Sequence, residues 1–142
     1  MELELLCRNA KAAKYEMQRY TTAQKNEALN RIADRLIANS ETIISANAKD
    51  LENAQAKGMS TALQDRLRLT AARIEGMSEG LRQVAALPDP IGEVLETFDR
   101  PNGLKLAKVR VPLGVIGIIY ESRPNVTADA FALTFKSGNV VI

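Results

Sequence analysis

The sequence predicts a mixed α/β fold, in which a layer of helices is followed by a β-hairpin and by the start of a parallel β-α-β unit. Three observations carry this prediction. Apolar residues recur at helical spacing through residues 3–87, and this spacing falls to near two after Pro90. Beyond the predicted hairpin, two apolar runs, 114–119 and 140–142, flank a segment with helical periodicity, in the order strand, crossover helix, strand.

The amino-terminal segment reads as helix after helix. The most regular of these helices carries an apolar face made of Leu29, Ile32, Ala33, Leu36 and Ile37. Thr21 and Gln24 precede this face with the spacing of a capping box. We expect the next helix to run from about Glu41 to Lys57 and to stop at Gly58, because glycine adopts a left-handed cap at little cost.

Two more helical segments precede the prolines. A short turn of helix is expected after Ser60. Thr70 then precedes a longer helix, whose apolar face holds Ile74, Met77, Leu81 and Val84. Pro88-Asp89-Pro90 ends the helical structure, because neither proline has a backbone N–H to donate.

A β-hairpin is predicted next, with strands 93–98 and 104–111 around the turn Arg100-Pro101-Asn102-Gly103. Two pairs of apolar residues in the second strand have opposite phases: Leu104 with Leu106, and Val109 with Val111. A bulge near Ala107 or Lys108 is therefore expected, since it would bring both pairs to one face.

The run Gly114–Ile119 is typical of a strand buried on both faces, and the helix that follows residues 120–125 is expected to be covered on most sides. Ser137-Gly138-Asn139 ends that helix, and Val140–Ile142 begins a second buried strand. A buried strand of three residues leaves its neighbours' backbone groups unpaired. We therefore expect the chain to be a truncated part of a longer protein.

Composition argues against several classes of function. Lys and Arg total 19 against 17 Asp and Glu, with no run of one sign, so a nucleic-acid partner is not expected. The longest uncharged apolar stretch, 111–120, is far shorter than the roughly 20 residues that cross a bilayer, and the acidic start is unlike a signal peptide. A soluble cytoplasmic protein without membrane contact is expected.

Cys7 is the single cysteine, and the chain has no histidine. An internal disulfide, the usual zinc sites and the Ser-His and Cys-His nucleophile pairs are therefore excluded within these 142 residues. Because Cys7 lies in an apolar-patterned segment, we expect a small buried thiol and not a nucleophile.

Residues 111–142, VPLGVIGIIYESRPNVTADAFALTFKSGNVVI, resemble the gamma-glutamyl phosphate reductases, also called glutamate-5-semialdehyde dehydrogenases. The Pro-Leu-Gly-Val-x-Gly start and the Gly-Asn-Val-Val end are shared with the wider aldehyde dehydrogenase superfamily. The segment Tyr120–Thr127 distinguishes this member. Asn47–Leu51 and Asp65–Leu69 fit as well, so the resemblance covers essentially the whole chain, but only the first third of such an enzyme.

The resemblance implies an oxidoreductase of proline biosynthesis. In such an enzyme a cysteine thiolate displaces phosphate from gamma-glutamyl phosphate, and NADPH then reduces the thioester to glutamate 5-semialdehyde. The family's cysteine lies in a later domain and Cys7 does not match it, so this fragment should be inactive alone. Residues 1–92 would form the helical part of the cofactor-binding domain, 93–112 the hairpin of an oligomerisation element in a homo-oligomer, and 113–142 the truncated first β-α-β unit.

The resemblance also implies site residues. Cofactor contacts are expected from Tyr120, Glu121 and Ser122, which follow the first parallel strand; an ordinary connecting loop is the alternative. The chain has no Gly-x-Gly-x-x-Gly, and the superfamily lacks it too. Arg123 would pair with a substrate carboxylate or phosphate, or simply be a surface arginine.

Asn125 would donate its amide to the oxyanion of the transition state, or else cap the following helix. The segment 114–138 is about two residues shorter than in typical aldehyde dehydrogenases, which leaves the alignment of Asn125 open. Asp129, in the predicted first helical turn, is explained by the helix dipole.

Two other functions remain compatible with these residues. A free-standing interaction module would use residues 93–112 to pair with another chain, but such a module should not end in an unfinished strand. A general aldehyde dehydrogenase would act on other acyl groups, and the loop Glu121–Asn125 argues against it.

Overall fold

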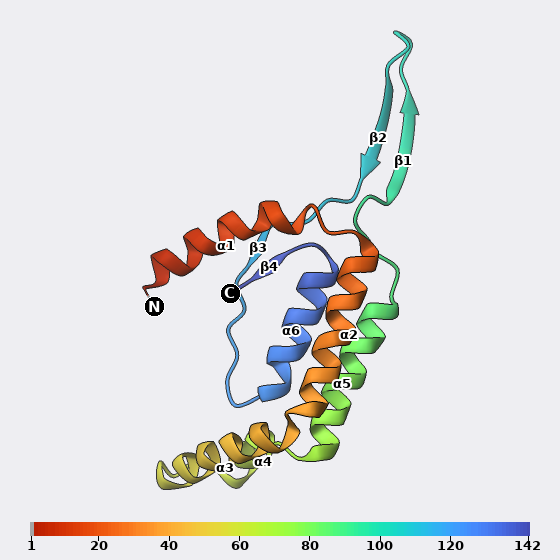
Figure 1. The fold of residues 1–142 in the computed structure, drawn as a ribbon. Coiled ribbons are helices and arrows are strands. Elements are labelled where there is room, and N and C mark those ends of the chain that lie inside the picture. Colours follow the sequence, from red (N-terminus) through yellow and green to blue (C-terminus); the bar gives the residue numbers. More distant parts are fainter. Residues whose placement is uncertain (1) are drawn as a thin grey trace.

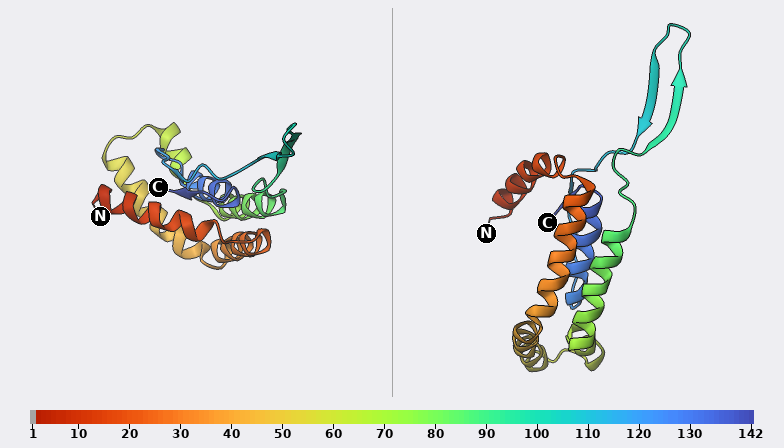
Figure 2. Two further views of the ribbon diagram at one scale, coloured as in Figure 1. Left: turned by 90° about the horizontal axis from the view of Figure 1, so that it is seen from above. Right: turned by 45° about the vertical axis from the view of Figure 1, so that its right-hand side comes forward.

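The computed structural model describes residues 2–142 and confirms the mixed α/β architecture (Figure 1). The elements in order are α1 (Leu3–Met17), α2 (Thr22–Ala38), α3 (Ser40–Ala56), α4 (Thr61–Leu67), α5 (Ala71–Ala86), β1 (Val94–Asp99), β2 (Lys105–Val109), β3 (Val115–Ile116), α6 (Pro124–Lys136) and β4 (Val140–Val141). Helices α2, α5 and α6 lie side by side, with α3 and α4 at one end and the β1–β2 hairpin projecting from the other (Figures 1 and 2).

The hydrophobic core lies where α2, α5 and α6 meet. Its buried residues are Leu29 and Ala33 from α2, Leu81 and Ala85 from α5, and Ala132 from α6. The predicted face of α5 is confirmed for Ile74, Met77 and Leu81, whereas Val84 is only half-buried and Ala85 takes the fully buried position. Small residues at these crossings let the helices approach closely, so the three helices form one packed unit.

Helix ends follow the predicted local signals. The capping box is present: the Thr21 hydroxyl accepts from the backbone N–H of Gln24, and the Gln24 side chain accepts from the backbone N–H of Thr21. Gly58 ends α3 at φ +72° with two backbone hydrogen bonds in the Schellman pattern, and Gly138 ends α6 at φ +73° in the same way. At Gly138 an added Cβ would lie 3.0 Å from Pro112 Cγ, so space as well as φ requires glycine.

A buried charge cluster joins α2, the Pro88–Pro90 turn and α6. The Lys25 ammonium forms an ion pair with Asp89 and donates to the Lys136 carbonyl oxygen at 3.1 Å. The Lys136 ammonium donates to Asn26 Oδ1 at 2.5 Å and to the Ala85 carbonyl at 2.8 Å. Each ammonium therefore has two oxygen partners, and such partners are the condition for burying these charges without a large penalty.

The hairpin confirms the predicted turn and strands but not the predicted bulge. The irregularity lies in β1, where Leu95 is the extra residue opposite the Val109–Lys108 step of β2. Since β2 stays regular near Ala107 and Lys108, its apolar residues remain divided between the two faces of the ribbon. Every residue of both strands is exposed.

Strands β3 and β4 pair in parallel, as predicted, through Val115 with Val140 and Ile116 with Val141. The prediction that 114–119 is buried on both faces is wrong for this chain. Its residues alternate between exposed and half-buried, because α1 packs against one face of β3, and Ile119 beyond the strand is fully exposed. Helix α6 is covered on most sides, as predicted, because it packs against α2, α5 and β4; Leu133, which is 56% exposed, lies on its uncovered side.

Cys7 is exposed, so the expectation of a buried thiol is also wrong. Helix α1 packs against β3 and β4 and buries only Ala10 and Met17. Its first turns extend beyond the strands, which leaves Leu3 and Cys7 without a covering layer (Figure 1). No helix within residues 2–142 is long and apolar enough to span a membrane.

Candidate functional site

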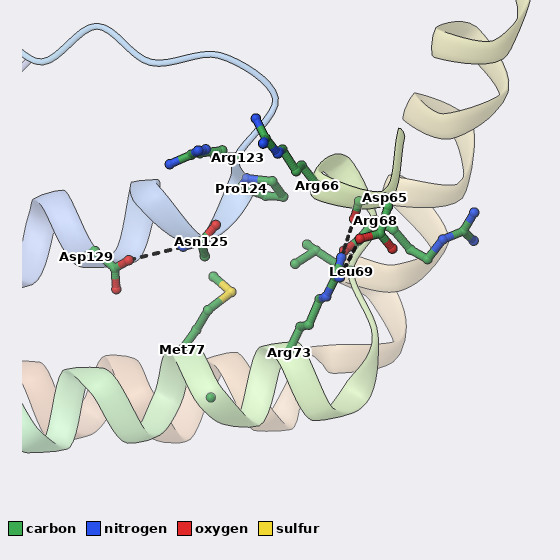
Figure 3. A pocket seen from close by; sticks show the side chains of 11 residues that line it. Asp65, Arg66, Arg68, Leu69, Arg73, Met77, Arg123, Pro124, Asn125 and Asp129 are labelled. Carbon is green, nitrogen blue, oxygen red and sulfur yellow. Dashed lines mark hydrogen bonds and ion pairs between the residues drawn. The ribbon is translucent and has the colours of Figure 1, made fainter. Parts of the chain in front are cut away.

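A pocket of about 480 Å³ lies between the α4–α5 connection, the first turns of α5 and the start of α6 (Figure 3). Arg123 and Asn125 line one wall, and Asp65, Arg66 and Arg68 line the opposite wall. Met77 rises from α5 between the two walls. The structure thus brings two of the predicted site residues into one concave site.

The α4 wall is held from behind by polar contacts. Asn47, buried in α3, donates from Nδ2 to the Leu67 carbonyl at 2.9 Å and accepts the backbone N–H of Leu69 at 2.7 Å. The Arg73 guanidinium donates to the backbone carbonyls of Asp65 and Arg68 and pairs with the Asp65 carboxylate at 3.1 Å. These contacts satisfy carbonyls at the end of α4 and fix the direction in which Arg66 and Arg68 leave the backbone.

The α6 wall begins at Pro124, the first helical residue, where a missing N–H costs nothing. Arg123 is the N-cap residue and makes no capping hydrogen bond. Asn125 therefore does not cap the helix, and the capping alternative is wrong. Its Nδ2 donates instead to Asp129 Oδ2 at 3.3 Å. Asp129 lies in the second turn, beyond the first turn where the helix dipole acts, so the dipole does not explain it.

Among the charged side chains of the two walls that form no ion pair within residues 2–142, arginines outnumber carboxylates. In Figure 3 the side chains of Arg66 and Arg123 lie on the same side of the pocket, near Pro124 and Asn125, whereas Arg68 extends away from Asn125. Arg73 is already paired with Asp65. The pocket is therefore suited to a small anionic ligand, because guanidinium groups match carboxylate and phosphate oxygens.

Tyr120, Glu121 and Ser122 do not line this pocket. They lie in the loop between β3 and α6, where the Tyr120 hydroxyl is 2.5 Å from Thr127 Oγ1 and the Glu121 side chain is exposed. Ser122 adopts φ +52°, an uncommon left-handed conformation for this residue that turns the chain toward α6. The predicted site residues thus form two groups, 120–122 in the loop and Arg123 with Asn125 in the pocket.

Sequence reasoning missed Arg66 and Asp129 as pocket residues. The segment Asp65–Leu69 is part of the family resemblance, yet no local pattern indicates that this segment faces residues 123–129. Within residues 2–142 no group of three Asp, Glu, Cys or His side chains is placed to hold a metal ion.

No family model matches the chain, but individual proteins do. It is 54% identical over 137 residues to the gamma-glutamyl phosphate reductase of Desulforamulus reducens, covering 96% of this chain and 33% of that protein. The enzyme of the same name from Clostridium novyi is 59% identical over 133 residues, covering 94% and 32%.

Solved structures agree with these sequence matches. The gamma-glutamyl phosphate reductase of Thermotoga maritima superposes with a TM-score of 0.95 at 42% identity, over 99% of this chain and 34% of that one. The Saccharomyces cerevisiae reductase gives 0.89 at 36% identity, over 94% and 34%. Fold and sequence thus point to the same group of relatives, all of which are named as reductases. Specifically, the chain is related to the gamma-glutamyl phosphate reductases and spans about a third of their length.

Proposed function

We propose that the complete protein containing these residues is a cytoplasmic oxidoreductase that uses NADPH to convert gamma-glutamyl phosphate to glutamate 5-semialdehyde and phosphate, a step of proline biosynthesis. The main observation behind the proposal is that Arg123 and Asn125 line the same pocket. Both come from the segment Tyr120–Thr127 that distinguishes the reductases, in a chain 54% identical to one of them.

In this proposal Asn125 stabilises developing negative charge. Its amide Nδ2 lies at the pocket wall and is held by only one long hydrogen bond, to Asp129. A donor so placed can turn toward a substrate oxygen without breaking a network, and a hydrogen bond to an oxyanion lowers the energy of the transition state. Arg123 neutralises an anionic group of the same substrate.

The nucleophilic thiolate lies outside these 142 residues in our proposal. Cys7 is exposed on α1, a helix that contributes no residue to the pocket. Residues 1–142 alone are therefore expected to bind substrate without converting it to product, since covalent catalysis needs a thiolate next to the reacting carbon.

In our proposal the loop after β3 contacts a nicotinamide dinucleotide. It leaves the carboxyl end of a parallel strand, the position at which α/β sheets bind ligands, and its Tyr120 and Glu121 side chains are accessible. Tyr120, Glu121 and Ser122 would hold the cofactor there, and the cofactor would supply the hydride. We assign residues 1–92 and 113–142 to this cofactor-binding domain.

Residues 93–112 are proposed to join copies of the complete protein into a homo-oligomer. The hairpin presents Val94, Leu95, Phe98, Leu106 and Val109 to solvent, and an apolar ribbon that projects from the body is typical of an association surface. Analytical ultracentrifugation of Phe98→Glu in the complete protein tests this assignment. A sedimentation coefficient equal to the wild type would contradict it.

The reaction is tested in the reverse direction. The complete protein should reduce NADP continuously with glutamate 5-semialdehyde only when inorganic phosphate is present, because phosphate must release the acyl group from the thiolate after the hydride has been transferred; without phosphate, reduction should stop at about one NADP per active site. Absence of phosphate-dependent reduction would reject the proposed reaction. Equal rates with unrelated aldehydes would favour a general aldehyde dehydrogenase.

A further inference from the structure

The arginines of this chain are unevenly paired. Six of the eleven form ion pairs with carboxylates within residues 2–142. Of the other five, three line the single pocket between α4 and α6: Arg66, Arg68 and Arg123. Like charges gathered at one site repel each other, and an anionic ligand between them would relieve that repulsion.

Arg66 and Arg123 are the two arginines placed to share such a ligand. They come from opposite walls, and their side chains lie on the same side of the pocket in Figure 3. Neither makes a side-chain hydrogen bond within residues 2–142, whereas Arg73 is committed to Asp65 and to the end of α4. Two planar guanidinium groups without other partners can both donate hydrogen bonds to the oxygens of one carboxylate.

Asp129 adds a negative charge on the same wall. Its carboxylate accepts one hydrogen bond, from Asn125, and pairs with no cation within residues 2–142. Gly80 lies against it: a Cβ added there would be 3.8 Å from Asp129 Oδ1. At Gly80, α5 therefore presents no side chain to this carboxylate.

We propose that this pocket binds the α-amino-acid head group of the substrate, with Arg66 and Arg123 on the α-carboxylate and Asp129 on the α-ammonium. The inference rests on the proposed function and extends it by assigning Arg66 and Asp129 to specificity. A free cationic pair beside a free carboxylate is complementary to a zwitterion. The substrate's phosphate carries no cation that could pair with Asp129, whereas the head group carries its ammonium beside the carboxylate, so the head group is the favoured ligand.

The first test compares Michaelis constants in the complete protein. Arg66→Gln and Arg123→Gln should each raise KM for glutamate 5-semialdehyde by about tenfold or more, the effect of losing a hydrogen bond to a charged group, with KM for phosphate unchanged. Arg35→Gln removes an exposed, unpaired arginine of α2 outside the pocket and serves as the matched control. Arg→Lys variants at 66 and 123 should restore part of the loss.

Three results would overturn the assignment of the arginines. If KM for phosphate rises instead, the pocket binds the leaving group. If neither KM moves, the arginines do not touch substrate. If Arg35→Gln has the same effect, the change reflects overall charge.

Asp129→Asn tests the ammonium contact. The complete protein should prefer glutamate 5-semialdehyde over 5-oxopentanoate, which lacks only the amine, and the variant should reduce this preference in kcat/KM by about tenfold. An unchanged preference would remove Asp129 from the site.

A separate arm distinguishes failure of the reaction from failure of the pocket. If the wild type does not reduce NADP at all, titration with L-glutamate still measures head-group binding calorimetrically. If the wild type binds L-glutamate and the Arg66→Gln and Arg123→Gln variants do not, the head-group assignment stands and the proposed reaction is rejected. If the wild type does not bind L-glutamate either, both proposals are rejected.

Discussion

Asn47 Oδ1 accepts the backbone N–H of Leu69 at 2.7 Å, and through this bond a helix outside the pocket determines the position of a pocket wall. The same side chain donates to the Leu67 carbonyl at 2.9 Å. Asn47 is 4% exposed, so water cannot replace either partner readily. The direction of Arg66 and Arg68 therefore depends on a residue that touches no ligand.

Asn47→Ala should lower the free energy of unfolding by about 1–3 kcal/mol, because it leaves the Leu69 N–H and the Leu67 carbonyl without partners. Urea unfolding of the complete protein measures this change. Asn53→Ala, an exposed asparagine of the same helix, is the control and should change stability by less than about 0.5 kcal/mol. Equal effects of the two substitutions would contradict the bridging role.

Asp89→Asn should destabilise the protein by about 3 kcal/mol at neutral pH, because buried Lys25 loses its counter-charge. Burial raises the pKa of Asp89, but hydrogen bonds from Lys25, the Ile91 N–H and Thr22 outweigh it and hold the pKa below its ordinary value of 3.8. The resulting stability is present above that value and is lost as pH falls through the lower pKa of the folded state.

Unfolding should therefore become easier below about pH 4 in the wild type, and Asp89→Asn should flatten this part of the profile. Urea unfolding between pH 2 and pH 7 measures both slopes. Asp34→Asn, which removes the exposed ion pair with Arg82, is the control and should cost less than about 1 kcal/mol. If the unfolding free energy of Asp89→Asn falls with acid as steeply as that of the wild type, Asp89 is not the group responsible for the acid sensitivity.

Gly138→Ala should destabilise by more than the roughly 1–2 kcal/mol that a left-handed backbone costs a non-glycine residue, since the new Cβ also meets Pro112 and Ile91. Gly80→Ala is the contrasting variant: it lies inside α5, its Cβ would make an ordinary contact, and alanine favours the helix by up to about 1 kcal/mol. Thermal unfolding compares the two, and a gain in stability at Gly138 would refute the packing argument.

Asn125→Ala should slow turnover in the complete protein by on the order of a hundredfold, the effect of removing one oxyanion donor. Thermal stability should stay near the wild type, because Asn125 is exposed and its one side-chain bond, to Asp129, is long. Steady-state kinetics and a melting curve on the same preparation check both. A loss of stability without a loss of kcat would assign Asn125 a structural role.

Local signals in the sequence account for the features that were predicted correctly. Thr21 with Gln24, Gly58 and the turn 100–103 each act through backbone groups within a few residues. Their effect is nearly independent of the rest of the fold, so the sequence predicts them well.

The features that were wrong or missed depend on distant neighbours. The extra residue Leu95 reflects how β1 pairs with β2, and the exposure of Cys7 reflects how far α1 extends past the strands. The Lys25, Asp89 and Lys136 cluster joins positions more than a hundred residues apart, and no periodicity indicates a buried lysine.

The sequence by itself determined the order of the elements, most of their ends, and the segment 120–127 on which the proposed function rests. Only the tertiary structure decided that Arg66 and Arg123 share a pocket and that Asn125 bonds Asp129 instead of capping α6. The physical reason is the sequence separation over which the interactions act. Caps and turns are set by interactions along the chain, whereas a binding site is set by which side chains the packed helices bring together.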